Sequence, residues 1–297
     1  MFAALLATSV WTLSSLASVG AARHLGGISA NLVRLVFALP FLLLFSFVLA
    51  TSPWQSLSRA GGEWFVWSGI IGMGVCDILM LSAYARLGAR VTTLVVNTCA
   101  APLAALIGWG ALGEHPTWLQ AGFMLVIVAS VSVVLRPRAS DRLEIIGLLC
   151  ALGSAVAFAS ASVMSRIGFL HAAAAGTPIH WLDSTIVRGT AGVALCLVVF
   201  AVAGWFARVW RDGPGCWSQA MPWLLLNAVL GPVIGLCCYQ WALSTATAAE
   251  VHAIVAILPV LVLIATWMLG EERPSPIKLV GTLFAVAGVI GLGLSHS

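Results

Sequence analysis

Residues 101–114 read APLAALIGWGALGE, and residues 258–271 read LPVLVLIATWMLGE. Each stretch runs from a proline through a dense apolar segment to Leu-Gly-Glu, and 157 positions separate the two. Similarity at one long, fixed separation indicates an internal duplication rather than a short motif repeated by chance. The repeat therefore predicts that this chain is built from two homologous halves.

Further residues recur at similar separations along the chain. The same offset relates Gly74 to Gly231 and Tyr84-Ala85 to Trp241-Ala242, while an offset of 154 relates Arg34 to Arg188. Near the start, an offset of 143 relates Arg23 to Arg166. The offset changes only through loops, as expected for a tandem duplication with insertions and deletions.

The composition places both halves in a membrane. Hydrophobic residues make up 61% of the chain and charged residues only 8%, whereas soluble chains are about one quarter charged. A helical span needs roughly 20 apolar residues, so the 297 residues accommodate about ten spans. We expect the first to be a helix and not a cleaved signal, because no basic region precedes it. The predicted spans are 2–20, 29–50, 64–84, 91–112, 118–135, 144–166, 183–205, 221–243, 249–269 and 277–294.

Five spans in each half is an odd number, so the halves must cross the membrane in opposite senses. The sequence thus predicts an all-α polytopic membrane protein with ten transmembrane helices in two inverted five-helix repeats. We place the first repeat at residues 1–137 and the second at residues 143–297.

These features resemble the EamA type of the drug/metabolite transporter (DMT) superfamily. The resemblance rests on Pro102 and Pro259, each followed by Leu-Gly-Glu and then by a glycine-containing fifth helix (Gly122 and Gly281), and it covers essentially the whole chain. It implies a transporter of small metabolites, which we expect to export them. It also implies a central cavity lined by helices one to four of each half, with the fifth helices bracing the assembly. One departure is Ala157-Phe158, where such repeats often carry tryptophan.

Charged residues within spans are costly, by about 2.5–3.5 kcal/mol each, and therefore indicate function. Arg34 and Asp77 should lie at similar depths, about 8 and 10 Å from the same membrane face, on adjacent antiparallel helices. They either form an ion pair that locks the helices, or Asp77 binds a cation, a proton or a substrate amine while Arg34 tunes its pKa. The repeat mate of Asp77 is Ile234, which cannot titrate.

Arg188 should lie at the matching depth from the opposite face. Its expected partners are Asp183 and Glu250, and the alternative is contact with substrate. Pro102 and Pro259 each free a carbonyl within a helix, so each is either a packing kink or a hinge. Asn227 and Gln240 are further polar candidates that could equally bond a neighbouring helix. The substrate-binding residues that we predict are Trp11, Asn31, Arg34, Asp77, Tyr84, Asn97, Arg188, Tyr239 and Trp241.

The sequence carries no recognisable enzyme signature. It has no His-Glu-x-x-His, Gly-x-Ser-x-Gly or Walker motif, and its seven cysteines lack metal-type spacing. We expect no catalytic residue, metal, cofactor or nucleic acid. Without a nucleotide site, transport should be driven by a gradient, with facilitated diffusion as the alternative. The expected partners are a small-molecule substrate, the lipid bilayer and a coupling proton, in a monomer or homodimer. A lipid-handling membrane enzyme and a non-transporting scaffold are the alternatives; the first needs clustered His, Asp or Cys, and the second needs no hydrated cavity.

The orientation is left open by two conflicting indications. Outside the spans, ten basic residues fall on the side opposite the termini and two on the side of the termini. The positive-inside rule then places both termini outside, whereas the family resemblance implies the reverse. In either orientation we expect an integral protein of a bacterial inner membrane.

Overall fold

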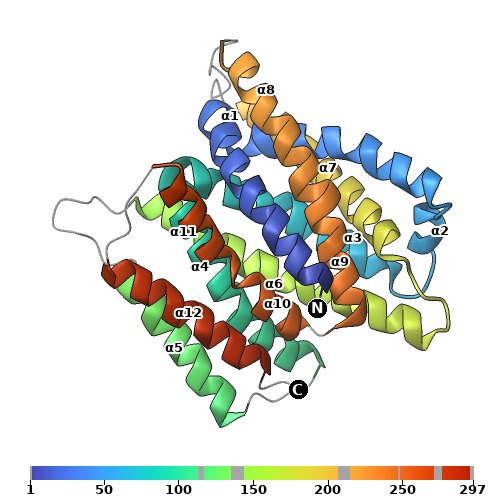
Figure 1. Cartoon of the computed structure of the whole chain (residues 1–297). Coiled ribbons are helices and arrows are strands. Elements are labelled where there is room, and N and C mark those ends of the chain that lie inside the picture. The colour runs from blue at the N-terminus through green and yellow to red at the C-terminus, as the bar shows by residue number, and fades with distance from the viewer. Residues whose placement is uncertain are drawn as a thin grey trace.

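In a computed structural model the chain is a bundle in which every described element is a helix (Figure 1). The structure describes residues 2–112, 117–134, 144–206, 215–246, 248–270 and 276–294. The first half contains α1 (Phe2–Val48), α2 (Pro53–Leu57), α3 (Gly62–Gly69), the π-helical η1 (Ile70–Cys76), α4 (Asp77–Leu112) and α5 (Trp118–Val134). The second half contains α6 (Ile145–Ala174), α7 (Trp181–Phe206), α8 (Gly215–Ala228), the π-helical η3 (Val229–Gly235), α9 (Leu236–Thr245), α10 (Ala248–Val255), α11 (Leu258–Met268) and α12 (Pro276–Leu294).

Two glycines divide the longest helical stretches. A straight helix of the 47 residues of α1 would measure about 70 Å, more than twice the thickness of a bilayer core. Instead the backbone leaves helical geometry at Gly26 (φ 71°, ψ 169°), and α1 folds back on itself (Figure 1). Gly88 (φ 76°, ψ 176°) interrupts α4 in the same way. Only glycine adopts this backbone region readily, so these two residues permit the reversals between consecutive predicted spans.

The apolar helices are suited to a membrane. Five stretches are long and apolar enough to cross one by length and composition, and two of them carry a glycine break between two predicted spans. Shorter apolar helices cover Leu258–Met268 and Leu279–Gly288. The all-helical membrane fold is confirmed, and the number of ten crossings stays a prediction. Of the two Leu-Gly-Glu motifs, Gly113, Glu114 and Glu271 lie outside the described residues.

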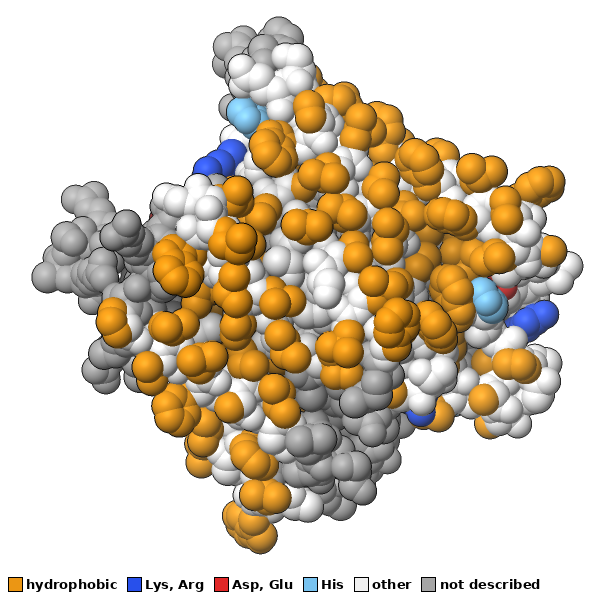
Figure 2. Space-filling model, in the orientation of Figure 1, with side chains coloured by type: hydrophobic (Ala, Val, Ile, Leu, Met, Phe, Trp, Pro, Cys, Tyr) orange, Lys and Arg blue, Asp and Glu red, His pale blue; other side chains and the backbone are white. Residues whose placement is uncertain are grey.

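The surface agrees with a lipid environment. Figure 2 shows one face covered by hydrophobic side chains, with the charged side chains visible only towards its margins. Large apolar residues point outward from several helices, including Phe45 and Phe47 of α1 and Phe284 of α12. Exposed apolar area on this scale is stable in lipid and would aggregate in water.

The fifth predicted spans of the two halves, α5 and α12, pack against each other at one side of the bundle (Figure 1). Gly288 and Gly291 of α12 allow the close approach, because the side chains of Ile127 and Phe123 of α5 lie where a Cβ would be added. Small residues commonly allow such contacts between membrane helices. The interior cavity is lined instead by residues of α1, η1, α4, α6, α7, η3, α9 and α11.

Candidate functional site

An interior cavity of about 90 Å³ is bounded by helices from both halves of the chain. It has room for several water molecules or for part of a small organic molecule. Three charged residues line it, together with aromatic, hydroxyl and apolar side chains from α1, η1, α4, α6, α7, η3, α9 and α11. The lining comprises Trp11, Ser14, Ser15, Ser18, Arg34, Gly72, Met73, Cys76, Asp77, Met80, Tyr84, Val96, Asn97, Phe158, Arg188, Gly231, Pro232, Leu236 and Leu258.

Six of the nine predicted substrate-binding residues line this cavity: Trp11, Arg34, Asp77, Tyr84, Asn97 and Arg188. Two others support it from behind: Asn31 bonds Arg34, and Tyr239 packs against Trp11 with ring centroids 5.1 Å apart. Trp241 lies elsewhere. It is 41% exposed and stacks on Trp181 at 6.2 Å.

Arg34 and Asp77 form the predicted ion pair between α1 and α4. Both side chains are largely buried, and Arg34 uses its other nitrogens as well. Its Nε donates to Asn31 Oδ1 at 2.9 Å and its Nη1 to Asn227 Oδ1 at 3.1 Å. The guanidinium is therefore hydrogen-bonded on three sides and electrically compensated.

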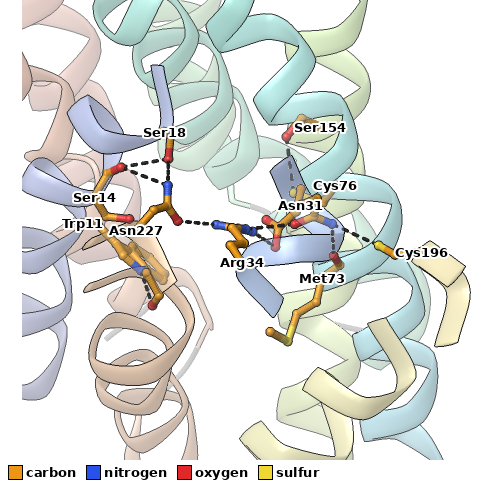
Figure 3. Close-up of polar contacts among 12 residues, drawn as sticks. Trp11, Ser14, Ser18, Asn31, Arg34, Met73, Cys76, Ser154, Cys196 and Asn227 are labelled. Atoms are coloured by element: carbon orange, nitrogen blue, oxygen red, sulfur yellow. Dashed lines mark hydrogen bonds and ion pairs between the residues drawn. The ribbon is translucent and has the colours of Figure 1, made fainter. Parts of the chain in front are cut away.

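Asn31 and Asn227 extend this network into both halves (Figure 3). The amide of Asn31 donates to the carbonyl of Met73 at 2.8 Å and contacts Cys196 Sγ at 3.2 Å. The amide of Asn227 donates to the carbonyl of Ser14 at 3.3 Å and to Ser18 Oγ. One chain of polar contacts thus joins α4, α1 and α8 beside the cavity.

The surroundings of Arg188 differ from those of Arg34. Its side chain is 2% exposed, and Nη1 donates to Ser165 Oγ at 2.8 Å. With the amide of Gln240 turned so that its oxygen faces the guanidinium, Gln240 accepts from Nε at 3.1 Å. No described carboxylate lies within 4.0 Å of Arg188. All of its described contacts are with neutral groups.

The predicted pairing of Arg188 with Asp183 is wrong. Asp183 accepts a hydrogen bond from Ser56 Oγ of α2 at 2.8 Å. The two residues are five positions apart on α7, so their side chains point in different directions around the helix. The other expected partner, Glu250, has a side chain outside the described residues.

Several contacts recur between the halves. Tyr84 Oη donates to Ser15 Oγ at 3.0 Å, and Tyr239 Oη lies 2.7 Å from Ser162 Oγ. Each tyrosine thereby joins a later helix to the first helix of its half. By contact, the mate of Tyr84 is Tyr239, not Trp241. A shift of two residues turns a helix by about 200°, which explains why Trp241 faces outward.

The π-helical segments η1 and η3 occupy equivalent positions in the two halves, and each contacts one of the two buried arginines. A Cβ on Gly231 of η3 would lie 3.5 Å from Arg34 Nη1, and one on Gly72 of η1 would lie 2.8 Å from Arg188 Nη2. Each arginine thus packs on a glycine from the other half. π-Helical turns are rare and frequently mark functional sites.

The two predicted hinges differ in the structure. Pro102 lies in the part of α4 that follows the break at Gly88, and its flanking residues remain helical. Pro259 lies in the first turn of α11, directly after the interruption at Ala256–Ile257 that separates α11 from α10. A proline is tolerated in a first helical turn, where its missing N–H has no partner to lose. Only the second position therefore coincides with a broken helix.

Sequence reasoning did not select several cavity residues: Ser14, Ser15, Ser18, Met73, Cys76, Met80 and Phe158. Small hydroxyl and sulfur-containing residues are common in membrane helices, so their type alone gives no signal. Phe158 was noted only as a departure from an expected tryptophan. It lies against Trp11, with ring centroids 6.2 Å apart, and closes one wall of the cavity.

Comparisons with known proteins agree with this architecture. The model of the EamA-like transporter family matches residues 1–136 and 145–294, once in each half. This chain is similar to a solved crystal structure that is titled only as that of a protein, with a TM-score of 0.66 and 20% sequence identity. The match covers 99% of this chain and 96% of that one. At that identity the likeness shows a shared fold. No curated protein matches in sequence.

Proposed function

We propose a mechanism for this chain from the premise that it belongs to the EamA-like transporter family, and so is a membrane transporter of the DMT superfamily. Its two repeats form ten crossings in inverted orientation. The cavity between them opens alternately to each side of a bacterial inner membrane and exports a small metabolite. The cycle is driven by a gradient, for which a proton is the candidate coupling ion.

The observation that carries this proposal is the cavity shared by both halves. It is lined by residues of α1 and α4 from the first half and of α6, α7, η3, α9 and α11 from the second. Inverted-repeat transporters bind substrate at such a repeat interface. Three charged side chains there are expensive in a membrane interior, which favours a binding role. A scaffold would need no polar cavity between its halves.

The segments best placed to bend lie beside the cavity. The π-helical η1 and η3 both supply lining residues, and the interruption between α10 and α11 comes just before Leu258. Irregular backbone at membrane depth is tolerated where it lines a cavity. We assign the change between the two access states to these segments.

Asp77 is the candidate coupling residue. It is the one acid among the described lining residues, and its repeat mate Ile234 cannot bind a proton or a cation. Release of Asp77 from Arg34 during the cycle would make its carboxylate available to a coupling ion. The alternative role is a structural lock between α1 and α4, in which Asp77 only compensates Arg34.

Reconstituted transport tests the proposal. The purified chain in proteoliposomes is assayed with labelled amino acids, sugars, nucleosides, organic acids and cationic drugs, against protein-free liposomes. Gly72→Leu should block transport, because its side chain would enter the space between Arg188 and Ala161. Gly110→Leu is the matched control in the same stretch, since nothing lies within 4 Å of its added Cβ. Transport that survives Gly72→Leu at the wild-type rate would contradict the cavity as the route.

A further inference from the structure

The cavity holds two buried guanidinium groups but one described carboxylate. Arg34 is paired with Asp77, whereas Arg188 has no carboxylate within 4.0 Å among the residues that the structure describes. The described charged lining therefore carries one surplus positive charge. A buried charge without a counter-ion is costly, and proteins normally keep one for a ligand, a metal or catalysis.

The neighbours of Arg188 orient the guanidinium without neutralising it. Ser165 accepts from Nη1 at 2.8 Å, and Gln240, with its oxygen turned inward, accepts from Nε at 3.1 Å. The nearby acid on its own helix, Asp183, bonds Ser56 instead. These contacts hold the side chain in place but leave its charge available.

Arg188 lines the cavity, and its Nη2 packs on Gly72, which also lines it. A Cβ on Gly72 would lie 2.8 Å from Nη2, so the glycine leaves room for that nitrogen. A planar guanidinium is the preferred protein partner of a carboxylate, which it binds through two parallel hydrogen bonds. The cavity also offers the apolar surfaces of Trp11, Phe158 and Leu258 to the body of an organic molecule.

We propose that Arg188 is the anion-recognition residue and that the transported substrate is a small organic acid carrying one carboxylate. One surplus charge matches a monoanion better than a phosphate monoester, which carries nearly two charges at neutral pH. This inference rests on the proposed transport function and specifies its substrate class. Arg34, already compensated by Asp77, does not compete for the same group.

The test uses the purified full chain in nanodiscs of zwitterionic lipid. The probes are four aromatic and aliphatic monocarboxylates, each with its neutral primary amide, and phenyl phosphate. Binding is followed by tryptophan fluorescence, since Trp11 lines the cavity, and by thermal shift. At least one acid should bind tenfold or more tightly than its amide. Equal binding of every acid and its amide, or tighter binding of phenyl phosphate than of any monocarboxylate, would overturn the proposal.

Two variants locate the effect at Arg188. Arg188→Gln should reduce acid affinity at least tenfold while leaving amide affinity within twofold. Gln240→Glu should also reduce acid affinity at least tenfold, because its carboxylate would neutralise Arg188. This variant keeps the arginine, so it tests the proposal even if Arg188→Gln does not fold. Arg86→Gln, on the partly exposed Arg86–Glu144 pair, is the control and should bind as wild type. Wild-type acid preference in either Arg188→Gln or Gln240→Glu would refute the assignment.

Two further arms separate the possible failures. Adding phosphatidylglycerol to the nanodiscs should leave acid affinity unchanged; competition by that lipid would mean that the site takes a lipid headgroup. Transport is then measured in proteoliposomes. If neutral solutes are transported and Arg188→Gln does not change that transport, the substrate class is wrong but the transport function stands. If acids bind through Arg188 and no solute is transported, the proposed function is wrong.

Discussion

Arg34 and Arg188 recur 154 positions apart in the two halves, yet their surroundings have diverged. Each is buried, lines the same cavity and packs on a π-helical glycine of the opposite half. Arg34 is compensated by Asp77, and Arg188 is bonded only to neutral groups in the described structure. Both halves thus keep a buried arginine, but only the first half has an acid, Asp77, that pairs with it in the described structure. The halves have therefore become chemically different while sharing an architecture.

Removing the counter-ion should produce the largest effect. Asp77→Ala leaves Arg34 buried and uncompensated, which typically costs about 3–5 kcal/mol of stability when a buried pair is broken. The measure is the folded fraction in detergent during a denaturant titration. Glu144→Ala breaks the partly exposed pair with Arg86 and should cost only about 0–1 kcal/mol. Equal losses in the two variants would show that Asp77 does not compensate Arg34.

Retaining the shape of Asp77 while removing its charge separates coupling from structure. Asp77→Asn should abolish gradient-driven accumulation but spare substrate exchange between the two sides of a proteoliposome. Accumulation and exchange are measured on the same preparation. A loss of folded protein would lower both, whereas a loss of coupling would lower accumulation alone. Full proton-driven uptake in Asp77→Asn would reduce Asp77 to a structural partner of Arg34. Failure of the variant to insert would favour the structural role by another route.

The fifth helices offer a second comparison between the halves. Gly291 of α12 faces Phe123 of α5, and an added Cβ would lie 2.6 Å from its Cζ. Gly122 of α5 has nothing within 4 Å of such a Cβ. Gly291→Ala should therefore destabilise by about 1–3 kcal/mol through overpacking. Gly122→Ala should change stability by less than about 1 kcal/mol, in the stabilising direction. Thermal unfolding in one detergent compares them, and similar shifts would contradict the observed α5–α12 packing.

Much of the fold follows from simple features of the sequence. Apolar composition and the Pro-to-Leu-Gly-Glu repeat predict an all-helical membrane protein of two halves. The rise per residue of a helix also predicts that Arg34 and Asp77 lie at similar depths in the membrane. Rise gives depth but not the direction in which a side chain points. For that reason the sequence wrongly predicts a pair between Arg188 and Asp183, and it predicts Trp241 in the cavity. In the structure Trp241 stacks on Trp181, and Asp183 accepts a hydrogen bond from Ser56.

The rest of the site depends on tertiary contacts that no local pattern encodes. Asn227 acts by bridging α8 to α1, and the cavity serines contribute only because α1 faces inward at those positions. That no described carboxylate lies within 4.0 Å of Arg188 depends on how several helices pack together. A small shift or rotation of α7 would change the neighbours of Arg188 without changing the apolar pattern of the sequence.

The smallest expected effect distinguishes two tyrosines with nearly the same contact. Tyr84 bonds Ser15 at 3.0 Å and Tyr239 bonds Ser162 at 2.7 Å, so Tyr84→Phe and Tyr239→Phe each remove one buried hydrogen bond. Each variant should lose about 1 kcal/mol of stability. Only Tyr84 lines the cavity, whereas Tyr239 lies behind Trp11 and also approaches His252 Nε2 at 3.4 Å. Ligand affinity should therefore fall a few-fold, by the same roughly 1 kcal/mol, in Tyr84→Phe alone. Fluorescence titration with the tightest-binding acid measures it. An equal loss of affinity in Tyr239→Phe would mean that the two halves contribute to the site more symmetrically than their charges suggest.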